Sequence, residues 1–264
     1  MNRTNFNLLV LFFFFGIYFG LDQLFFTTVQ SQIASLFQQR ALAHMLTYVL
    51  SLVPLLMGAL LLHPKNKETL MSKFGLNGSL VLGGAVAGLA TLPMFIGYAF
   101  RFSLIKHPDF NSLMINTVSA GLFEELIFRA YFFGLVYRYT RLGFIPAILA
   151  TSSVFALLHL YQSQDPMELV LIFATTFLGS VLFAWLYIEW KFNLWVPIAL
   201  HILMNLAWML FDVDDNAAGN WYANIFRFLT IAVVIILTVI RAKNRHSGLQ
   251  VNKKTLWRKL ENYD

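Results

Sequence analysis

Long apolar runs alternate with short polar stretches along nearly the whole chain. An α-helix needs about 20 predominantly apolar residues to cross the roughly 30 Å hydrocarbon core of a bilayer. The fourth and sixth runs exceed this length, so we expect those helices to tilt or to extend beyond the lipid. The pattern predicts an all-α protein with eight membrane-spanning helices, at residues 6–26, 45–62, 80–100, 113–139, 144–160, 167–190, 194–211 and 221–240.

The composition supports a polytopic membrane protein. Of the 264 residues, 58% are hydrophobic and 12% are charged, and the mean hydropathy is +0.66. In an ordinary soluble domain about half of the residues are apolar and about a quarter are charged. Because the connections are short and no internal repeat is evident, we interpret residues 1–240 as one transmembrane helical domain, followed by a basic tail at 241–264. The absence of cysteine from the sequence excludes a disulfide, a thiolate nucleophile and a Cys-ligated metal.

The 19 Lys and Arg residues are distributed unevenly among the loops. If the N-terminus is inside, the inner loops and the tail hold most of them, whereas the outer loops hold Arg40, Arg101 and Lys106. Cytoplasmic loops of membrane proteins are enriched in Lys and Arg. We therefore expect a multi-pass protein of the cell membrane with both termini in the cytoplasm. A basic tail that follows a span indicates contact with anionic membrane lipids rather than with nucleic acid.

Two acids and an arginine interrupt the fourth apolar segment, in the sequence GLFEELIFRA at 121–130. Glu125 and Arg129 are four residues apart, so they share one face of a helix and can pair. Glu124 lies about 100° around that helix, which leaves it to face a cavity as a general base or acid. The alternative is that Glu125 and Arg129 form an ion pair of helix packing while Glu124 extends toward water. Because charge inside a bilayer is costly, the second acid favours a functional site.

Two later segments each carry a histidine with a partner four residues away. FALLH places Phe155 and His159 on one helix face, and HILMN places His201 and Asn205 on another. One intramembrane histidine is more often a packed, hydrogen-bonded residue, but two of them beside an acid pair favour a catalytic site. Counted at ~1.5 Å per residue, Glu124 and His159 both lie ~22 Å along their helices, and His201 only ~10 Å. We expect the other histidines at the surface, namely His44, His63, His107 and His246.

The three motifs, in this order, resemble those of the CAAX-protease and bacteriocin-processing (CPBP, or Abi) family of intramembrane endopeptidases. They are Glu124-Glu125-xxx-Arg129, Phe155-xxx-His159 and His201-xxx-Asn205, and they cover about a third of the chain. The resemblance implies an eight-helix, all-α membrane fold with a catalytic cavity inside the bilayer. It also implies hydrolysis of a peptide bond in a membrane-associated peptide or protein.

The resemblance further implies a role for each motif residue. Glu124 would activate the attacking water, and His159 would orient that water or share its proton. His201 and Asn205 would stabilise the tetrahedral oxyanion. Glu125, Arg129 and Phe155 would support the site.

The sequence leaves the metal question and two other functions open. Glu124, His159 and His201 match a catalytic zinc ligand set with water in the fourth position, yet the His-Glu-x-x-His helix of many zinc proteases is absent. We therefore favour a mechanism that requires no cofactor. One competing function is a non-enzymatic bacteriocin-immunity or binding protein on the same fold. The other is a proton- or ion-coupled transporter, which is disfavoured because no repeat symmetry or paired broken helices are evident.

Overall fold

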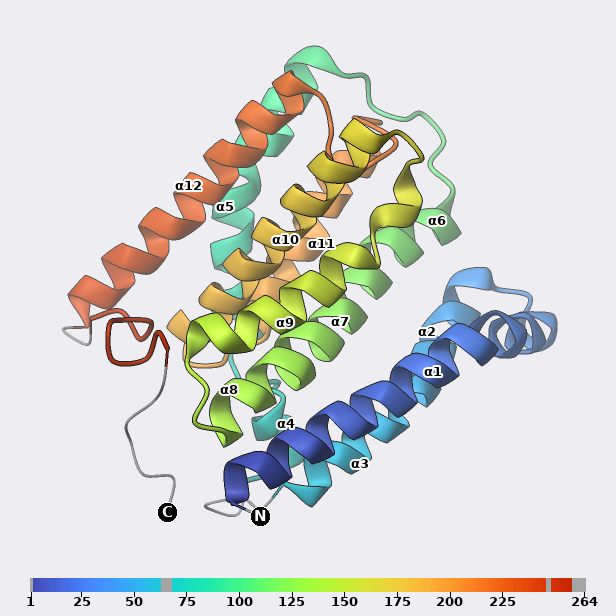
Figure 1. Ribbon diagram of the computed structural model, residues 1–264. Helices are drawn as coiled ribbons and strands as arrows, with labels where there is room; N and C mark the ends of the chain where they lie inside the picture. The colour runs from blue at the N-terminus through green and yellow to red at the C-terminus, as the bar shows by residue number, and fades with distance from the viewer. Residues whose placement is uncertain (1, 63–67, 246–247, 258–264) are drawn as a thin grey trace.

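The computed structural model describes residues 2–62, 68–245 and 248–257, and every regular element in these ranges is a helix (Figure 1). The all-α prediction is therefore confirmed. The elements are α1 (Arg3–Phe37), α2 (Arg40–Ser51), α3 (Val53–Leu61), α4 (Leu70–Lys73), α5 (Leu80–Arg101), α6 (Phe110–Met114), η1 (Ile115–Ser119), α7 (Ala120–Glu124), η2 (Glu125–Leu135), α8 (Val136–Tyr139), α9 (Phe144–Leu157), η3 (Leu160–Gln162), α10 (Pro166–Glu189), α11 (Trp195–Leu210) and α12 (Trp221–Asn244).

Each of the eight predicted segments falls on helix, and six helical stretches are long and apolar enough to cross a membrane by themselves. Two predicted segments are outside that group. The helix at 113–139 alternates between α and π hydrogen bonding and carries Glu124, Glu125 and Arg129. The helix α11 has 16 residues, or ~24 Å, which is shorter than the hydrocarbon core. The six are Arg3–Phe37, Arg40–Leu61, Leu80–Arg101, Phe144–Gln162, Pro166–Glu189 and Trp221–Asn244.

The chain from α6 to α8 forms one continuous helical rod that contains two π-helical stretches. η1 and η2 flank the five-residue α7. A π-helix bonds residue i to residue i+5, and such turns are rare and frequent at functional sites. Every residue of η2 is buried, so this rod is the central element of the bundle, and the acid pair lies where α7 meets η2.

The other helices surround this rod. α5 packs on α11 and α12, and α9 packs on α10. α1 lies beside α2 and α3, and together these form a layer that contacts η1 and η2 (Figure 1). The first turn of α1 and the last turn of α12 lie toward the same end of the bundle, at the lower left of Figure 1. This agrees with an even number of crossings, while the side that faces the cytoplasm stays a prediction.

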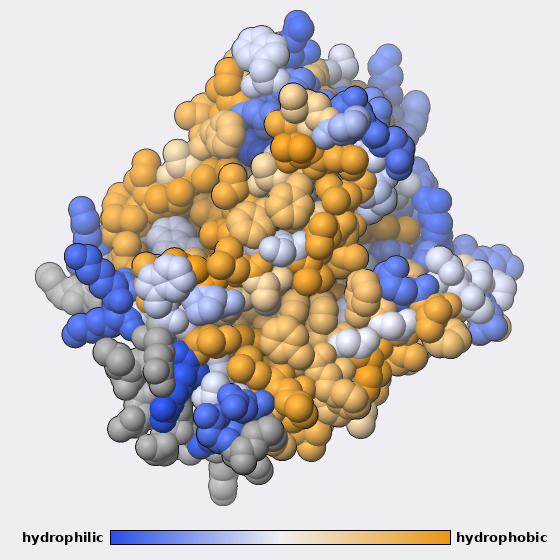
Figure 2. Space-filling model, viewed as in Figure 1, coloured by the Kyte–Doolittle hydropathy of each residue, from blue (hydrophilic) through white to orange (hydrophobic). Residues whose placement is uncertain are grey.

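Much of the outer surface of the bundle is apolar. Figure 2 shows hydrophobic residues over most of the visible face, with hydrophilic residues gathered toward its margins. Large exposed side chains on this surface include Phe13, Val81, Phe100 and Leu178. A soluble monomer rarely exposes so much contiguous apolar area. The exposed helix faces are therefore suited to contact with lipid acyl chains.

Residues 248–257 fold back onto the bundle. Both carboxylate oxygens of Glu189, at the end of α10, accept backbone N–H groups, one from Gln250 and one from Val251. The carbonyl oxygens of residues 255–257 accept the N–H groups of residues 143–145, at the start of α9. The first N–H groups of a helix lack partners within it, so this segment caps α9. The predicted division at residue 240 stays a prediction, and α12 itself runs to Asn244.

Candidate active site

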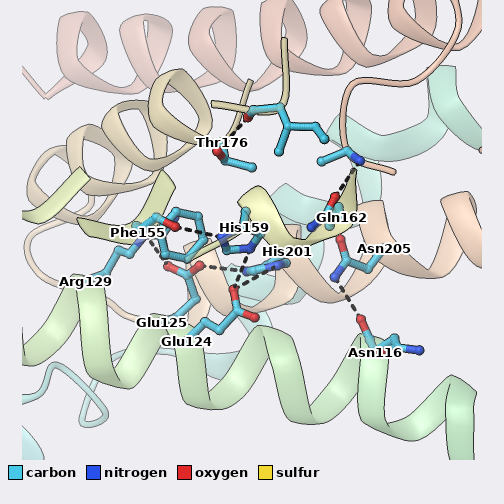
Figure 3. A network of polar contacts seen from close by, with 12 residues as sticks. Asn116, Glu124, Glu125, Arg129, Phe155, His159, Gln162, Thr176, His201 and Asn205 are labelled. Atoms are coloured by element: carbon cyan, nitrogen blue, oxygen red, sulfur yellow. Dashed lines mark hydrogen bonds and ion pairs between the residues drawn. The ribbon is translucent and has the colours of Figure 1, made fainter. Parts of the chain in front are cut away.

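Glu124, the last residue of α7, faces histidines from two other segments (Figure 3). Its Oε2 atom lies 4.0 Å from Nε2 of His159, just after α9, and 3.9 Å from Nε2 of His201 in α11. The exposed fractions of the three side chains are 23% for Glu124, 20% for His159 and 12% for His201. Three residues predicted from separate segments therefore meet at one place, and water can reach that place.

Hydrogen bonds at Nδ1 fix the orientation of the two imidazoles and decide which ring nitrogen carries the proton. Nδ1 of His159 lies 2.7 Å from the carbonyl oxygen of Phe155, and Nδ1 of His201 lies 2.8 Å from Oε1 of Glu125. A carbonyl and a carboxylate both accept, so each Nδ1 carries the proton and each Nε2 of a neutral ring is an acceptor. Glu124 Oε2 is a further acceptor, buried and without a hydrogen-bond donor in the described ranges. Acceptors at this separation need a hydrogen-bond donor between them, and a water molecule has the size and the two O–H groups for that role.

Glu125 is fully buried and is held from two sides. Its Oε2 lies 3.2 Å from Nε of Arg129, and the two side chains are 0% and 2% exposed. The predicted Glu125–Arg129 pair is thus confirmed. The contact is not aligned as a hydrogen bond, because neither of these two atoms has a hydrogen-bond partner among the described residues. The pair is an electrostatic contact in apolar surroundings, and Oε1 remains free to orient His201.

Phe155 links this ion pair to His159. The guanidinium carbon of Arg129 lies 4.2 Å from the centroid of the Phe155 ring and 5.4 Å from that of Phe183. Both distances are within cation–π range. The same Phe155 ring lies 4.4 Å from the His159 ring, and its backbone carbonyl accepts from that imidazole. The four-residue spacing of the Phe-xxx-His motif therefore has a physical reason, since one residue positions the imidazole through its ring and its backbone.

Asn205 lies one turn after His201 on α11 and contacts the central rod. Its Nδ2 donates to the carbonyl oxygen of Asn116 in η1, over 2.8 Å (Figure 3). One N–H of the amide is thereby committed to η1, and the second N–H is left for another acceptor. The contact ties α11 to the π-helical turn, and the oxyanion role of Asn205 stays a prediction.

His201 reaches the site although its position along α11 predicted a shallower depth. Leu194 and Val196, at the start of this helix, are both 0% exposed. The N–H of Leu194 donates to the carbonyl of Gly75. Neighbouring helices therefore cover the start of α11, and the depth of His201 in the membrane stays a prediction.

The expectation that His44 lies at the surface is wrong. This residue of α2 is half-buried, and its Nδ1 lies 2.9 Å from Oγ of Ser119, one turn before Glu124. The His44 ring also packs against Phe26 and Tyr48. The i, i+4 spacing of His44 and Tyr48 is the only signal in the sequence, and it does not say what the pair faces. His107 is exposed as expected, while His63 and His246 lie outside the described residues.

Glu124, His159 and His201 do not fit a tetrahedral metal centre as they stand. Ligands at 2.0–2.1 Å from a tetrahedral zinc are about 3.3 Å from each other. The two oxygen–nitrogen separations here are 4.0 Å and 3.9 Å. Over the described ranges, no three His, Asp or Glu residues are arranged to hold a metal ion. The separations suit a bridging water better than a shared metal.

Comparison with known proteins gives two partial matches. Residues 107–207 match the family described as type II CAAX prenyl endopeptidase Rce1-like. The chain is also similar to "Putative membrane peptidase YdiL" of Bacillus subtilis (strain 168), with 34% identity over 93 residues. That match covers 35% of this chain and 34% of the relative, so the chain spans about a third of the curated relative's length. No solved structure matches the chain. All three motifs lie within the region that the family covers.

Proposed function

From the membership of residues 107–207 in the CAAX-protease and bacteriocin-processing family, we infer that this chain is an intramembrane endopeptidase. It hydrolyses a peptide bond in a membrane-associated peptide or protein. The observation that carries this proposal is the approach of two imidazole Nε2 atoms to one partly exposed carboxylate oxygen of Glu124. Amide hydrolysis without a serine or cysteine nucleophile needs an activated water, and this arrangement can hold and deprotonate one.

In the proposed reaction, Glu124 acts first as a base and then as an acid. Its Oε2 takes one proton from the water as the water oxygen bonds to the carbonyl carbon of the substrate. His159 Nε2 accepts a hydrogen bond from the other O–H and so orients the attack. The protonated Glu124 then gives its proton to the leaving nitrogen as the C–N bond breaks. The products are a carboxylic acid and an amine.

His201 stabilises the oxyanion of this reaction in its doubly protonated form. Its Nδ1–H is committed to Glu125, so its Nε2 can donate only when the ring is an imidazolium. A charged donor aimed at a developing oxyanion is among the stronger catalytic contacts. Asn205 contributes the N–H that the Asn116 carbonyl does not take.

We propose that the reaction proceeds without a metal. The support is geometric, because both separations from Glu124 Oε2 to imidazole Nε2 exceed those of a tetrahedral centre. The partners are the membrane lipids around the exposed apolar faces and the peptide substrate. With both termini in the cytoplasm, the end of the bundle that carries the capped start of α9 would face inward.

The test uses the full-length protein in liposomes with a pool of quenched-fluorescence peptides, read by fluorescence and mass spectrometry. Glu124→Gln keeps the size of the side chain and removes the base, and His159→Ala removes the orienting ring. We expect each to lower the rate by roughly 10²–10⁴-fold, as for loss of a general base. Glu168→Gln, at an exposed glutamate in α10, should cleave at the wild-type rate.

Cleavage by Glu124→Gln at the wild-type rate would exclude the proposed mechanism. If the wild-type protein cleaves nothing while it still captures a peptide, the alternative of a non-enzymatic immunity or binding protein replaces the protease. The two functions are thereby separated in one set of measurements.

A further inference from the structure

Gly121 lies on the side of α7 that meets α11. It is buried, and it precedes Glu124 by three residues, so the two residues share one face of the helical rod. A Cβ atom on Gly121 would lie 2.5 Å from Cγ1 of Ile202 and 3.1 Å from the backbone N of the same residue. Ile202 directly follows His201 on α11. The backbones of the two helices that carry Glu124 and His201 therefore come close together at this glycine.

A glycine at this place needs a physical reason. Inside a helix, glycine is less stable than alanine because it loses more conformational freedom on folding. Gly121 is part of the regular helix α7 and does not have a positive φ angle, so a left-handed backbone does not explain it. The remaining reason is the missing side chain, which allows two helices to approach closely inside a membrane.

Two hydrogen bonds hold α11 against the rod, one on each side of Gly121 in the sequence (Figure 3). Before the glycine, the carbonyl of Asn116 accepts from Nδ2 of Asn205 over 2.8 Å. After it, Oε1 of Glu125 accepts from Nδ1 of His201, also over 2.8 Å. A contact of about 3.6 Å is no longer a hydrogen bond. The part of α11 that carries His201 therefore has little freedom to move away from the rod without the loss of one of these bonds.

A methyl group on Gly121 would displace α11. Ordinary contact for a Cβ atom begins at 3.4 Å, so the 2.5 Å separation from Cγ1 of Ile202 is 0.9 Å too short. Isoleucine is branched at Cβ and has one strongly preferred χ1 rotamer in a helix, so this side chain cannot easily swing away. Since the backbone N of Ile202 also lies inside 3.4 Å, the helix itself has to move, and His201 moves with it.

We propose that Gly121 is a positioning residue for peptide hydrolysis, and that its missing side chain sets the place of His201 relative to Glu124. In the proposed reaction Glu124 holds the water and His201 stabilises the oxyanion, so the two groups need a fixed separation, which is 3.9 Å between Oε2 and Nε2. A misplacement of about 1 Å can lower a rate by roughly 10²-fold. The inference rests on the protease function proposed above, and Gly121 acts in it through His201.

The test measures kcat and KM of the full-length protein in liposomes with a peptide that the wild type cleaves. We expect Gly121→Ala to lower kcat by roughly 10²-fold and to leave KM within about threefold of the wild type. Adding Ile202→Ala removes the Cγ1 atom that the new methyl group meets, so the double variant should regain at least about tenfold in kcat. Should Gly121→Ala fail to fold, the double variant carries the test, since restored folding and cleavage support the contact and continued failure overturns it.

The matched control is Gly97→Ala in α5, where the Cβ would lie 2.2 Å from the Phe226 ring of α12. This contact is as tight but joins two helices that carry none of the candidate site residues, so the variant should lower the Tm and keep kcat near the wild-type value. An unchanged kcat in Gly121→Ala, no rescue by Ile202→Ala, or an equal loss of kcat in Gly97→Ala overturns the positioning role, while Glu124-dependent cleavage still supports the protease. A wild type that cleaves no peptide overturns both proposals.

Discussion

Substitution by alanine should lower the thermal stability at Glu125 and should abolish cleavage with little loss of stability at Glu124. Glu125 is 0% exposed and pairs with Arg129, which is 2% exposed. Glu125→Ala leaves that guanidinium buried without its counter-charge and removes the acceptor of His201 Nδ1–H. Breaking a buried pair by removing one partner costs about 3–5 kcal/mol. Because Arg129 keeps its contact with the Phe155 ring at 4.2 Å, we place the loss at the lower end, about 3 kcal/mol.

For a protein of this size, 1 kcal/mol corresponds to roughly 2–4 °C in Tm. Glu125→Ala should therefore lower the Tm in detergent by roughly 6–12 °C, as measured by thermal shift or by loss of helical circular dichroism. Glu124→Ala is the matched control. Its side chain is 23% exposed, and its buried oxygen has no hydrogen-bond donor in the described ranges, so the Tm should change little while cleavage is lost.

A double variant isolates the ion pair from the rest of the site. Glu125→Ala combined with Arg129→Met removes both charges, and it should be more stable than Glu125→Ala alone because no buried charge is left unpaired. Equal Tm losses for Glu124→Ala and Glu125→Ala would refute the division of labour between the two acids. So would a Glu125→Ala protein that melts within a degree of the wild type.

Four further predictions concern Phe155, Asn205, the metal question and the 248–257 segment. Phe155→Leu should lower both the Tm, by a few degrees, and the cleavage rate, because the ring contacts Arg129 and His159; an unchanged rate would limit Phe155 to packing. Asn205→Ala should lower kcat by roughly 10²–10³-fold if its amide donates to the oxyanion, whereas a drop in Tm alone would limit it to holding η1. Cleavage should persist after treatment with EDTA and 1,10-phenanthroline, and activity that is lost and then restored by zinc would refute the metal-free mechanism. Gly143→Ala would place a Cβ 2.5 Å from the backbone of Trp257 and should release the 248–257 segment to proteases, whereas Gly179→Ala, with nothing within 4 Å, should not.

The sequence predicted the chemistry of the site better than its surroundings. Residues four apart on one helix carry their own geometry, so the Glu125–Arg129 pair and the Phe155–His159 contact could be predicted from spacing alone. The family resemblance supplied the grouping of Glu124 with two histidines from other helices, and the structure brings these three together.

What the sequence could not show depends on how the helices pack. The burial of the start of α11 is set by its neighbours, which the sequence pattern of this helix does not give. The packing of α2 against η1 and α7 is likewise tertiary, and therefore the surroundings of His44 were not predicted. The π-helical stretches around α7 change the hydrogen-bonding register without an obvious marker such as proline, so the segment at 113–139 read as one plain span.

The capping of α9 by residues 255–257 has a consequence for biosynthesis. The acceptors for the first N–H groups of this helix are more than a hundred residues further along the chain. During translation these groups stay without those acceptors until α10, α11 and α12 have been made. The helix α9, which ends two residues before His159, is therefore capped late, and a nascent chain that stops before residue 255 lacks these hydrogen bonds. In this order of synthesis, the start of α9 is completed only after every later helix of the bundle has been made.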